Sequence, residues 1–249
     1  MPRIAVIILT KNEEANIEGA MDSAAFADEI VIIDSGSTDR TKELAEKRGA
    51  KFVSHPMDDE GFAGQRNFAL IQTRAEWVLY LDADERLNDK LVMEIKKHIA
   101  ECPQYAAEIQ RVNVVMGQTM YHGVYRPDYC QRLFKRENVR WESVVHEHAV
   151  TDMPTVCLKT PMEHLCLTNW HQYMSKFDRY TTLMAEEMKL RGKKVGWLQM
   201  HSHAMFAFLK MYLLKGGFLD GKLGFILCQL HYFYTLMKYV KLHDLYKQE

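Results

Sequence analysis

The stretch WVLYLDADER, residues 77–86, places acidic side chains directly after an apolar run. The run WVLYL has the composition of a buried β-strand, and Asp82, Asp84 and Glu85 follow it at once. Such a cluster has three explanations: a cap for the next helix, a metal site, or a solvated turn. Which one applies depends on what the rest of the chain places beside this strand end.

The first hundred residues alternate between strand and helix patterns. Apolar, β-branched runs predict strands at 4–9, 29–34, 51–55 and 76–81. Helical patterns lie between them, at 13–25, from the cap candidates 37–39 to residue 48, and at 62–73. Asn88 can cap a further helix. This order predicts an α/β fold with a mainly parallel sheet in three layers and right-handed crossovers.

The pattern changes after Pro103. Residues 106–116 and 129–135 are typical of strands and predict antiparallel additions to the sheet, whereas the chain becomes helical from Asn169 onward. We therefore expect a domain at 1–165, with halves at 1–102 and 103–165, followed by a helical C-terminal extension at 166–249.

Composition excludes several classes of protein. Of 249 residues, 47% are hydrophobic and 26% are charged, and the net charge of −1 gives no basic field to attract nucleic acid. The 5 cysteines are scattered and form no CxxC pair, which indicates reduced thiols and a cytoplasmic protein. The N-terminal apolar run is interpreted as a first strand and not as a signal peptide. The uncharged segment 223–237 is too short and too polar for a transmembrane helix.

Polar side chains follow three of the predicted parallel strands. Ligands of open α/β sheets bind beyond the carboxyl ends of the strands, so these side chains predict one shared site. The strand ends are Thr10, Asn12 and Glu13 after the first strand, Asp34 and Ser35 after the second, and Asp82 and Asp84 after the fourth.

The kind of ligand follows from what these strand ends contain. The first turn, TKNEE, has no glycine, and no GxxxxGK[ST] motif occurs, so a dinucleotide fingerprint and a P-loop are both absent. A divalent cation is then the expected partner for phosphates. Asp82 and Asp84 are two residues apart in an extended segment and point to the same side, which suits Mg²⁺ or Mn²⁺. The alternative is that Asp84 only caps or turns the chain before Asn88.

Two further residues belong to this edge. An acid in the position of Asp34 often bonds a ribose hydroxyl or a base. Arg66, in GQRNFAL, opens the third predicted helix and can pair with a phosphate or with Asp82. Its alternative is a surface arginine with no role in binding.

Together, ILTKNEE, IVIIDSGSTDRT, GQRNFAL and YLDADER closely resemble the family 2 glycosyltransferases of GT-A fold. WESVVHEHA and the tail from FLDGKLGF onward are similar to the lipopolysaccharide-core β-glucosyltransferase subgroup. The resemblance implies an inverting hexosyltransferase with a nucleotide-diphosphate donor, here a UDP-sugar, and a divalent metal. It also implies roles for the strand-end residues. The nucleoside would contact Thr10, Asn12, Glu13 and Asp34, Asp82 would lie beside ribose and metal, and Asp84 would bind the metal directly.

The acceptor side must supply a general base, because inverting transfer requires a carboxylate that takes the acceptor's proton. The ED motif of many members is absent, and VHE stands in its place, so Glu147 is the candidate. His146 is expected near the diphosphate or the metal, or is a structural histidine. The rival carboxylates are Asp128, Glu142 and Asp220.

We therefore expect a transferase acting on a lipid-linked or envelope glycan such as lipopolysaccharide core. The alternatives are a sugar-1-phosphate nucleotidyltransferase and a non-catalytic sugar-nucleotide-binding module. Aromatic and apolar residues alternate with lysines at 204–242, which predicts peripheral contact with the inner face of the cytoplasmic membrane. Packing of this segment on the protein core or on a second subunit is the alternative.

Overall fold

The computed structural model describes residues 2–57, 61–143 and 147–247. The chain forms two compact units. The first consists of Met1–Arg111 and Asp128–Leu165, and the second of Val112–Pro127 and Cys166–Glu249. The hairpin segment 112–127 thus belongs with the C-terminal helices, and the expected division at residue 165 stays a prediction.

The parallel half of the sheet is as predicted. Four strands run parallel in the order β3-β2-β1-β4. They are β1 Ile4–Thr10, β2 Glu29–Asp34, β3 Lys51–Ser54 and β4 Trp77–Asp82. Every residue of β1 is buried, because helices cover both faces of this half. In register, Thr10 pairs with Asp34 and Leu9 with Asp82, so the three polar strand ends meet at one edge.

Antiparallel strands extend the sheet beyond β4. β8 pairs with both β4 and β6, and the path continues through β12 to β5. These strands are β5 Glu85–Arg86, β6 Ala106–Val115, β7 Gln118–Met120, β8 Asp128–Lys135, β11 Thr155–Cys157 and β12 Met162–Leu167. A separate hairpin joins β9 Val139–Glu142 to β10 His148–Thr151. The predicted mixed sheet is confirmed, although β5, β7 and β9 to β12 were not expected from the sequence.

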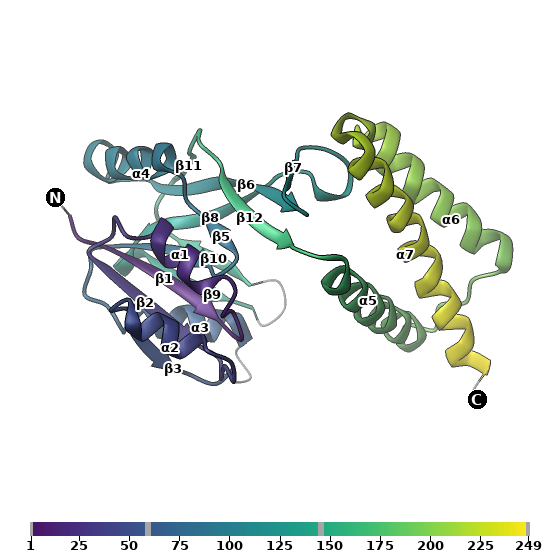
Figure 1. The fold of residues 1–249 in the computed structure, drawn as a ribbon, viewed down its shortest axis with the longest axis horizontal. Helices are drawn as coiled ribbons and strands as arrows, with labels where there is room; N and C mark the ends of the chain where they lie inside the picture. The colour runs from purple at the N-terminus through teal and green to yellow at the C-terminus, as the bar shows by residue number, and fades with distance from the viewer. Residues whose placement is uncertain (1, 58–60, 144–146, 248–249) are drawn as a thin grey trace. The chain divides into compact units, whose positions relative to one another are not determined.

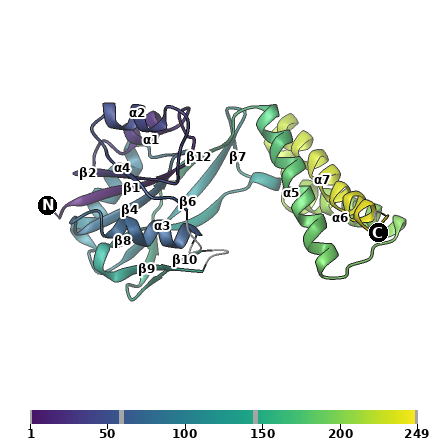
Figure 2. The same ribbon diagram turned by 90° about the horizontal axis from the view of Figure 1, so that it is seen from below.

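Helices cover both faces of the parallel strands. Figure 2 shows α1 and α2 on one side of the sheet and α3 on the other. The helices of this unit are α1 Ile17–Ser23, α2 Thr41–Lys47, α3 Gly61–Leu70 and α4 Asp89–Glu101. Asn88 caps α4 as predicted, since its side chain accepts from the N–H of Leu91. α1 begins later than predicted, because Asn12 has a left-handed φ of 56° and a turn precedes Ile17.

The core of the first unit lies around β4. Trp77, Tyr80 and Phe134 are among its largest fully buried side chains, and Tyr80 packs edge-on against both Phe134 and Trp141. Fully burying an aromatic side chain of this size contributes about 1.5–3 kcal/mol. This packing provides a rigid base for the acidic residues that follow β4.

The second unit is built on three long helices, α5 Trp170–Leu190, α6 Trp197–Leu209 and α7 Gly221–Lys247. α7 packs against both α5 and α6, and these are the green and yellow helices of Figure 1. Asn169 caps α5 through the N–H of Gln172. A π-helical segment at Lys210–Leu214 and a 3₁₀ turn at Gly217–Asp220 join α6 to α7.

Candidate active site

The loop after β2 is organised by Asp34. Its buried carboxylate accepts hydrogen bonds from the backbone N–H groups of Gly36, at 3.0 Å, and Ser37, at 2.8 Å, and from the Ser37 hydroxyl. An aspartate that bonds the backbone two and three residues later closes a turn. Gly36 has a φ of 92°, a conformation that glycine adopts without strain. The turn therefore holds Ser35 and Ser37 at the carboxyl end of β2.

The loop after β1 is tied to the same turn. The N–H of Asn12 donates to the Ser37 hydroxyl at 2.8 Å, and the Asn12 side-chain oxygen accepts from the N–H of Thr38 at 2.8 Å. The N–H of Glu13 donates to the hydroxyl of Thr41 at 2.8 Å. These contacts make the first two strand ends one preorganised wall. Asn12 and Asp34 brace the wall, and their expected contact with a nucleoside stays a prediction.

A hollow of about 400 Å³ opens beside this wall. It brings together most of the predicted site residues, and we call it the first hollow. Its lining includes Thr10, Glu13, Ser35, Arg66, Asp82, Asp84 and Glu147. Asn12 and Asp34 do not line it. The buried Oγ1 of Thr10 has no hydrogen-bond partner among the described residues, and it can therefore accept or donate a bond to a ligand.

Asp82 is held by two arginines. Arg132 Nη2 lies 2.7 Å from Asp82 Oδ2, and Arg66 Nη2 lies 3.4 Å from Asp82 Oδ1. Burial alone would raise the pKa of Asp82, but attraction to Arg132 and Arg66 outweighs it and holds the pKa well below its ordinary value. Asp82 is thus a fixed anion whose two oxygens are both engaged.

Glu85 continues this chain of charges into the interior. It is fully buried, accepts from the N–H of Asp82 at 2.9 Å, and contacts Arg132 at 2.6 Å and Arg111 at 3.3 Å. Burial raises the pKa of Glu85 against the opposing attraction of Arg132. The third acid of the opening stretch therefore orients the arginines and the backbone of Asp82.

Asp84 has a different partner. Its Oδ2 lies 3.2 Å from Nε2 of His164 on β12, and both side chains line the first hollow. The carboxylates of Asp82 and Asp84 thus have different partners, although both residues line the first hollow, and their expected role as a shared metal site stays a prediction. His164 was missed from the sequence, because only the pairing of β12 with β5 brings it here.

Glu147 lies where the first hollow meets a second one. The second hollow, of about 370 Å³, is lined by residues of β6, β8, β9 and β10, and it shares Arg66, Asp82 and Glu147 with the first. The Glu147 side chain is 25% exposed and lies 3.7 Å from Nη2 of Arg66. Glu147 and Asp82 both line the two hollows, but both oxygens of Asp82 contact arginines. Glu147 is therefore the better placed of the two to contact ligands in both hollows. His146 lies outside the described residues.

The rival carboxylates have structural partners. Arg111 donates two hydrogen bonds to Asp128, at 3.0 and 2.8 Å, and these outweigh partial burial and hold the pKa of Asp128 below its ordinary value. Glu142 is exposed, pairs with Arg140 and lines neither hollow. Asp220 belongs to the second unit. Its carboxylate accepts a hydrogen bond from the backbone N–H of His122 and lies 2.9 Å from Nδ1 of the same residue. The role of Glu147 as the base therefore stays a prediction.

The chain is similar to known proteins over most of its length. Residues 5–152, more than half of the chain, match the description "Glycosyl transferase family 2". An uncharacterized glycosyltransferase of Rickettsia bellii is 28% identical over 257 residues, covering 98% of this chain and 87% of the relative. The lipopolysaccharide core biosynthesis glycosyltransferase LpsC of Rhizobium meliloti is 28% identical over 254 residues, covering 97% and 92%.

A solved structure is also similar over part of the chain. It is glucosyl-3-phosphoglycerate synthase from Mycobacterium tuberculosis in complex with Mn²⁺ and UDP-glucose, at 26% identity and a TM-score of 0.38. The similarity covers 45% of this chain and 44% of the synthase, so this chain spans less than half of its length.

Proposed function

The chain belongs to glycosyl transferase family 2, and from that premise we propose that it is a metal-dependent inverting transferase. It moves a hexose from a UDP-sugar to a hydroxyl of a lipid-linked or envelope glycan. The observation that carries the proposal is the position of Glu147 between two hollows that share Arg66 and Asp82. A donor in the first hollow and an acceptor in the second then meet beside one carboxylate.

The first hollow suits a nucleoside diphosphate. Arg66 is 7% exposed, and its Nε and Nη1 are buried without a hydrogen-bond partner among the described residues. Leaving such donors unsatisfied is costly, and phosphate oxygens are strong acceptors for a guanidinium. Thr10 Oγ1 is a third buried atom without a hydrogen-bond partner among the described residues, and it lies on the wall formed by β1 and β2. We assign the diphosphate to the Arg66 side and the nucleoside to this wall.

The residues present also fit a divalent metal. Asp84 and His164 offer a carboxylate oxygen and an imidazole nitrogen to the same hollow, whereas Asp82 has both oxygens on arginines. Two protein ligands, completed by substrate phosphates, are a common arrangement for Mg²⁺ and Mn²⁺ sites. The carboxylate suits either Mg²⁺ or Mn²⁺, and the imidazole suits a transition metal better than it suits Mg²⁺. When bound, the metal supplies charge that stabilises the departing diphosphate.

The transfer itself needs one proton acceptor. The acceptor hydroxyl oxygen attacks the anomeric carbon while Glu147 takes its proton, and the bond from that carbon to the diphosphate oxygen breaks with its electron pair. Attack from the face opposite the departing UDP inverts the configuration. Arg66, whose cationic carbon lies 4.6 Å from the Trp141 ring centroid, is held rigidly beside the leaving group.

The glycan acceptor is supported by LpsC, whose name places it in lipopolysaccharide core biosynthesis and which aligns with 97% of this chain. Such an acceptor is membrane-bound, and the second unit has a surface that suits a membrane. Residues 204–242 contain five lysines and one acid, Asp220, which is buried. Exposed apolar side chains in this segment are Met205, Phe206, Leu209, Leu213, Leu214, Phe218, Leu219, Phe225, Ile226, Phe233, Met237 and Val240.

We propose that this apolar and basic surface rests on the inner face of the cytoplasmic membrane. None of the helices in the described ranges has the length and apolar character needed to span a bilayer. The contact is therefore proposed as peripheral, with lysines near the headgroups and apolar side chains in the interface.

The test is an assay of donor turnover. The protein is incubated with Mn²⁺ and a panel of UDP-sugars, with and without rough lipopolysaccharide as acceptor, and released UDP is measured. The proposal predicts UDP release that increases with acceptor. Pyrophosphate release from UTP and a sugar 1-phosphate would instead show a nucleotidyltransferase, and saturable binding without any turnover would show a non-catalytic module.

A further inference from the structure

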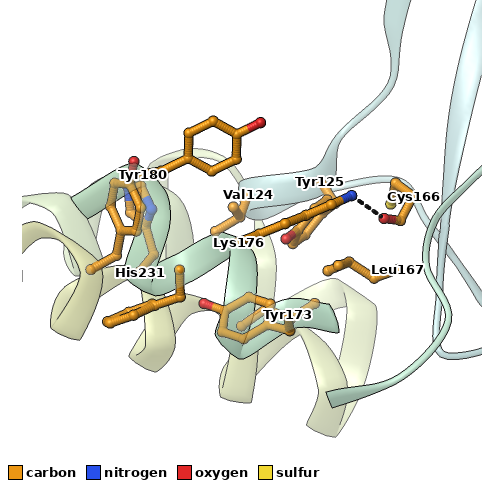
Figure 3. Close-up of a pocket in the computed structure, with 11 residues that line it drawn as sticks. Val124, Tyr125, Cys166, Leu167, Tyr173, Lys176, Tyr180 and His231 are labelled. Atoms are coloured by element: carbon orange, nitrogen blue, oxygen red, sulfur yellow. Dashed lines mark hydrogen bonds between the residues drawn. The ribbon is translucent and has the colours of Figure 1, made fainter. Parts of the chain in front are cut away.

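The second unit contains a cavity of its own, of about 430 Å³. Ligand-sized pockets typically measure about 300–1,000 Å³. Its lining comes from the 3₁₀ turn at Gly123–Tyr125, the end of β12, α5 and α7. All of these segments belong to the second unit. Figure 3 shows the side chains around it, with those of Tyr125, Tyr173, Lys176 and His231 labelled.

Aromatic rings dominate this cavity, and most of them carry a hydroxyl group. Five of its eleven lining residues are Tyr125, Tyr173, Phe177, Tyr180 and Tyr234. The rings of Tyr173 and Phe177 lie 6.2 Å apart, and those of Phe177 and Tyr234 lie 5.8 Å apart, so they form a continuous aromatic wall. Three of the other lining residues, Val124, Leu167 and Leu227, are aliphatic.

The phenol groups are hydrogen-bond donors at neutral pH. Burial raises the pKa of Tyr173 to about 12 and raises that of Tyr125 further. A hydrocarbon chain would leave such groups without partners, at a cost for each one that loses water. A pyranose ring suits this lining. The C–H groups on its faces can pack against the aromatic rings, and the hydroxyls around its rim can form hydrogen bonds with the phenol groups.

The charge of the cavity is positive. Lys176 lines it, and its amine donates to the carbonyl oxygen of Cys166 at 3.2 Å, as the dashed line in Figure 3 shows. No carboxylate lies among the lining residues, and Lys176 has no ion pair within the described part of the chain. Burial lowers the pKa of the lining residue His231, and the positive charges of Lys238 and Lys210 lower it further.

We propose that this cavity binds an acidic sugar residue, carrying a carboxylate or a phosphate, of the acceptor glycan. The aromatic wall packs on the sugar ring, the phenols of Tyr125 and Tyr173 bond its hydroxyls, and Lys176 pairs with its anionic group. The proposal rests on the proposed function for the identity of the acceptor. It assigns recognition of a further sugar residue of the acceptor to the second unit, apart from the two hollows in which transfer is proposed.

The test is direct binding of small probes to the full-length protein without donor or metal. Glucuronic acid and glucose 6-phosphate are titrated by NMR, with glucose as the neutral control and octanoate as the apolar anion. We expect the acidic sugars to bind more tightly than glucose or octanoate. Lys176→Met, which keeps the apolar stem, should weaken acidic-sugar binding by about tenfold or more, and Tyr173→Phe should weaken binding of all three sugars.

Controls separate this site from the rest of the protein. Lys194→Met removes an exposed lysine of the same unit outside the cavity, and Asp84→Asn alters the first hollow. Both should bind the acidic sugars as the wild type does, and thermal melting of each variant checks folding. Equal binding of glucose and glucuronic acid, or no effect of Lys176→Met, would overturn the proposal. Tighter binding of octanoate would show a lipid site instead. Loss of donor turnover with intact sugar binding would count against the proposed function alone.

Discussion

The guanidinium of Arg66 lies 3.7 Å from the carboxylate of Glu147, measured from Nη2 to Oε1. The same nitrogen lies 3.4 Å from Asp82 Oδ1. Arg66 thus connects the acid at the end of β4 with the acid that precedes β10, and it does so at the boundary of the two hollows. The proposed reaction depends on this connection, because Arg66 would pair with the diphosphate directly beside Glu147, the proposed base for the acceptor.

Glu147→Gln should separate chemistry from donor binding. The amide keeps the size of the side chain and removes its basicity, so transfer should fall by about 10²–10⁴-fold while UDP affinity stays within a few-fold of wild type. Glu142→Gln is the matched control, because Glu142 is exposed and lines neither hollow. Transfer within a few-fold of wild type would remove Glu147 from the role of base. Joint loss of UDP affinity and melting temperature would show that Glu147 is structural.

Asn67 should act as a positioning residue for the hairpin that leads to Glu147. Its side chain bonds both the carbonyl and the N–H of Trp141 on β9, each at 2.8 Å. Asn67→Ala leaves two backbone groups unpaired and should lower the free energy of unfolding by about 1–3 kcal/mol. We also expect kcat to fall more than UDP affinity. The exposed Asn138→Ala is the control, and equal melting curves for both variants would contradict the role of Asn67.

The parallel half of the fold was predictable because β1, β2 and β4 are largely buried on both faces and are therefore nearly continuous apolar runs. Because parallel strands align their carboxyl ends, the strand assignments also predicted that Thr10, Asp34 and Asp82 lie at one edge of the sheet. The short strands β9 to β12 lacked such a signal. Their residues are mostly half-buried or exposed, and their pairing depends on distant partners.

The unpredicted part of the site comes from that antiparallel half. Arg111 lies on β6, Arg132 on β8 and His164 on β12, and each contacts an acid near the end of β4. Asp84 and His164 are 80 positions apart in the chain. Spacing along a sequence indicates neighbours only within one element, so pairs of this kind become visible when the register of the sheet is known. One signal was present: an arginine in each of two otherwise strand-like segments.

The stability of the second unit should depend on pH through His231. Burial lowers its pKa, and Lys238 and Lys210 lower it further, so the unfolded chain binds its proton more readily. Stability is then highest above the ordinary histidine pKa of about 6.5 and is lost as the pH falls below that value. The melting temperature of wild type should fall relative to His231→Gln between pH 7 and pH 5. A difference that is constant, or that grows in favour of wild type on acidification, would contradict this.

Membrane contact should depend on lysines that lie between α6 and α7 and in the first turn of α7. Replacing Lys210, Lys215 and Lys222 by Gln removes three charges, each contributing about 1 kcal/mol near an anionic surface. Flotation with anionic liposomes at low salt should therefore fall by roughly a hundredfold in apparent affinity. The control replaces three exposed lysines of the first unit, Lys42, Lys47 and Lys97. Equal flotation of both triple variants, or no flotation of wild type, would contradict the proposed surface.

The most direct test of the central claim is calorimetric titration of UDP with and without Mn²⁺. We predict binding to wild type that requires Mn²⁺ and disappears with EDTA, because the proposed metal ligands Asp84 and His164 line the hollow to which the diphosphate is assigned. Asp84→Asn and His164→Gln should each lose most of this metal-dependent binding, whereas Glu147→Gln should retain it. UDP affinity that is the same in EDTA as in Mn²⁺, or unchanged in Asp84→Asn, would contradict a metal-dependent donor site.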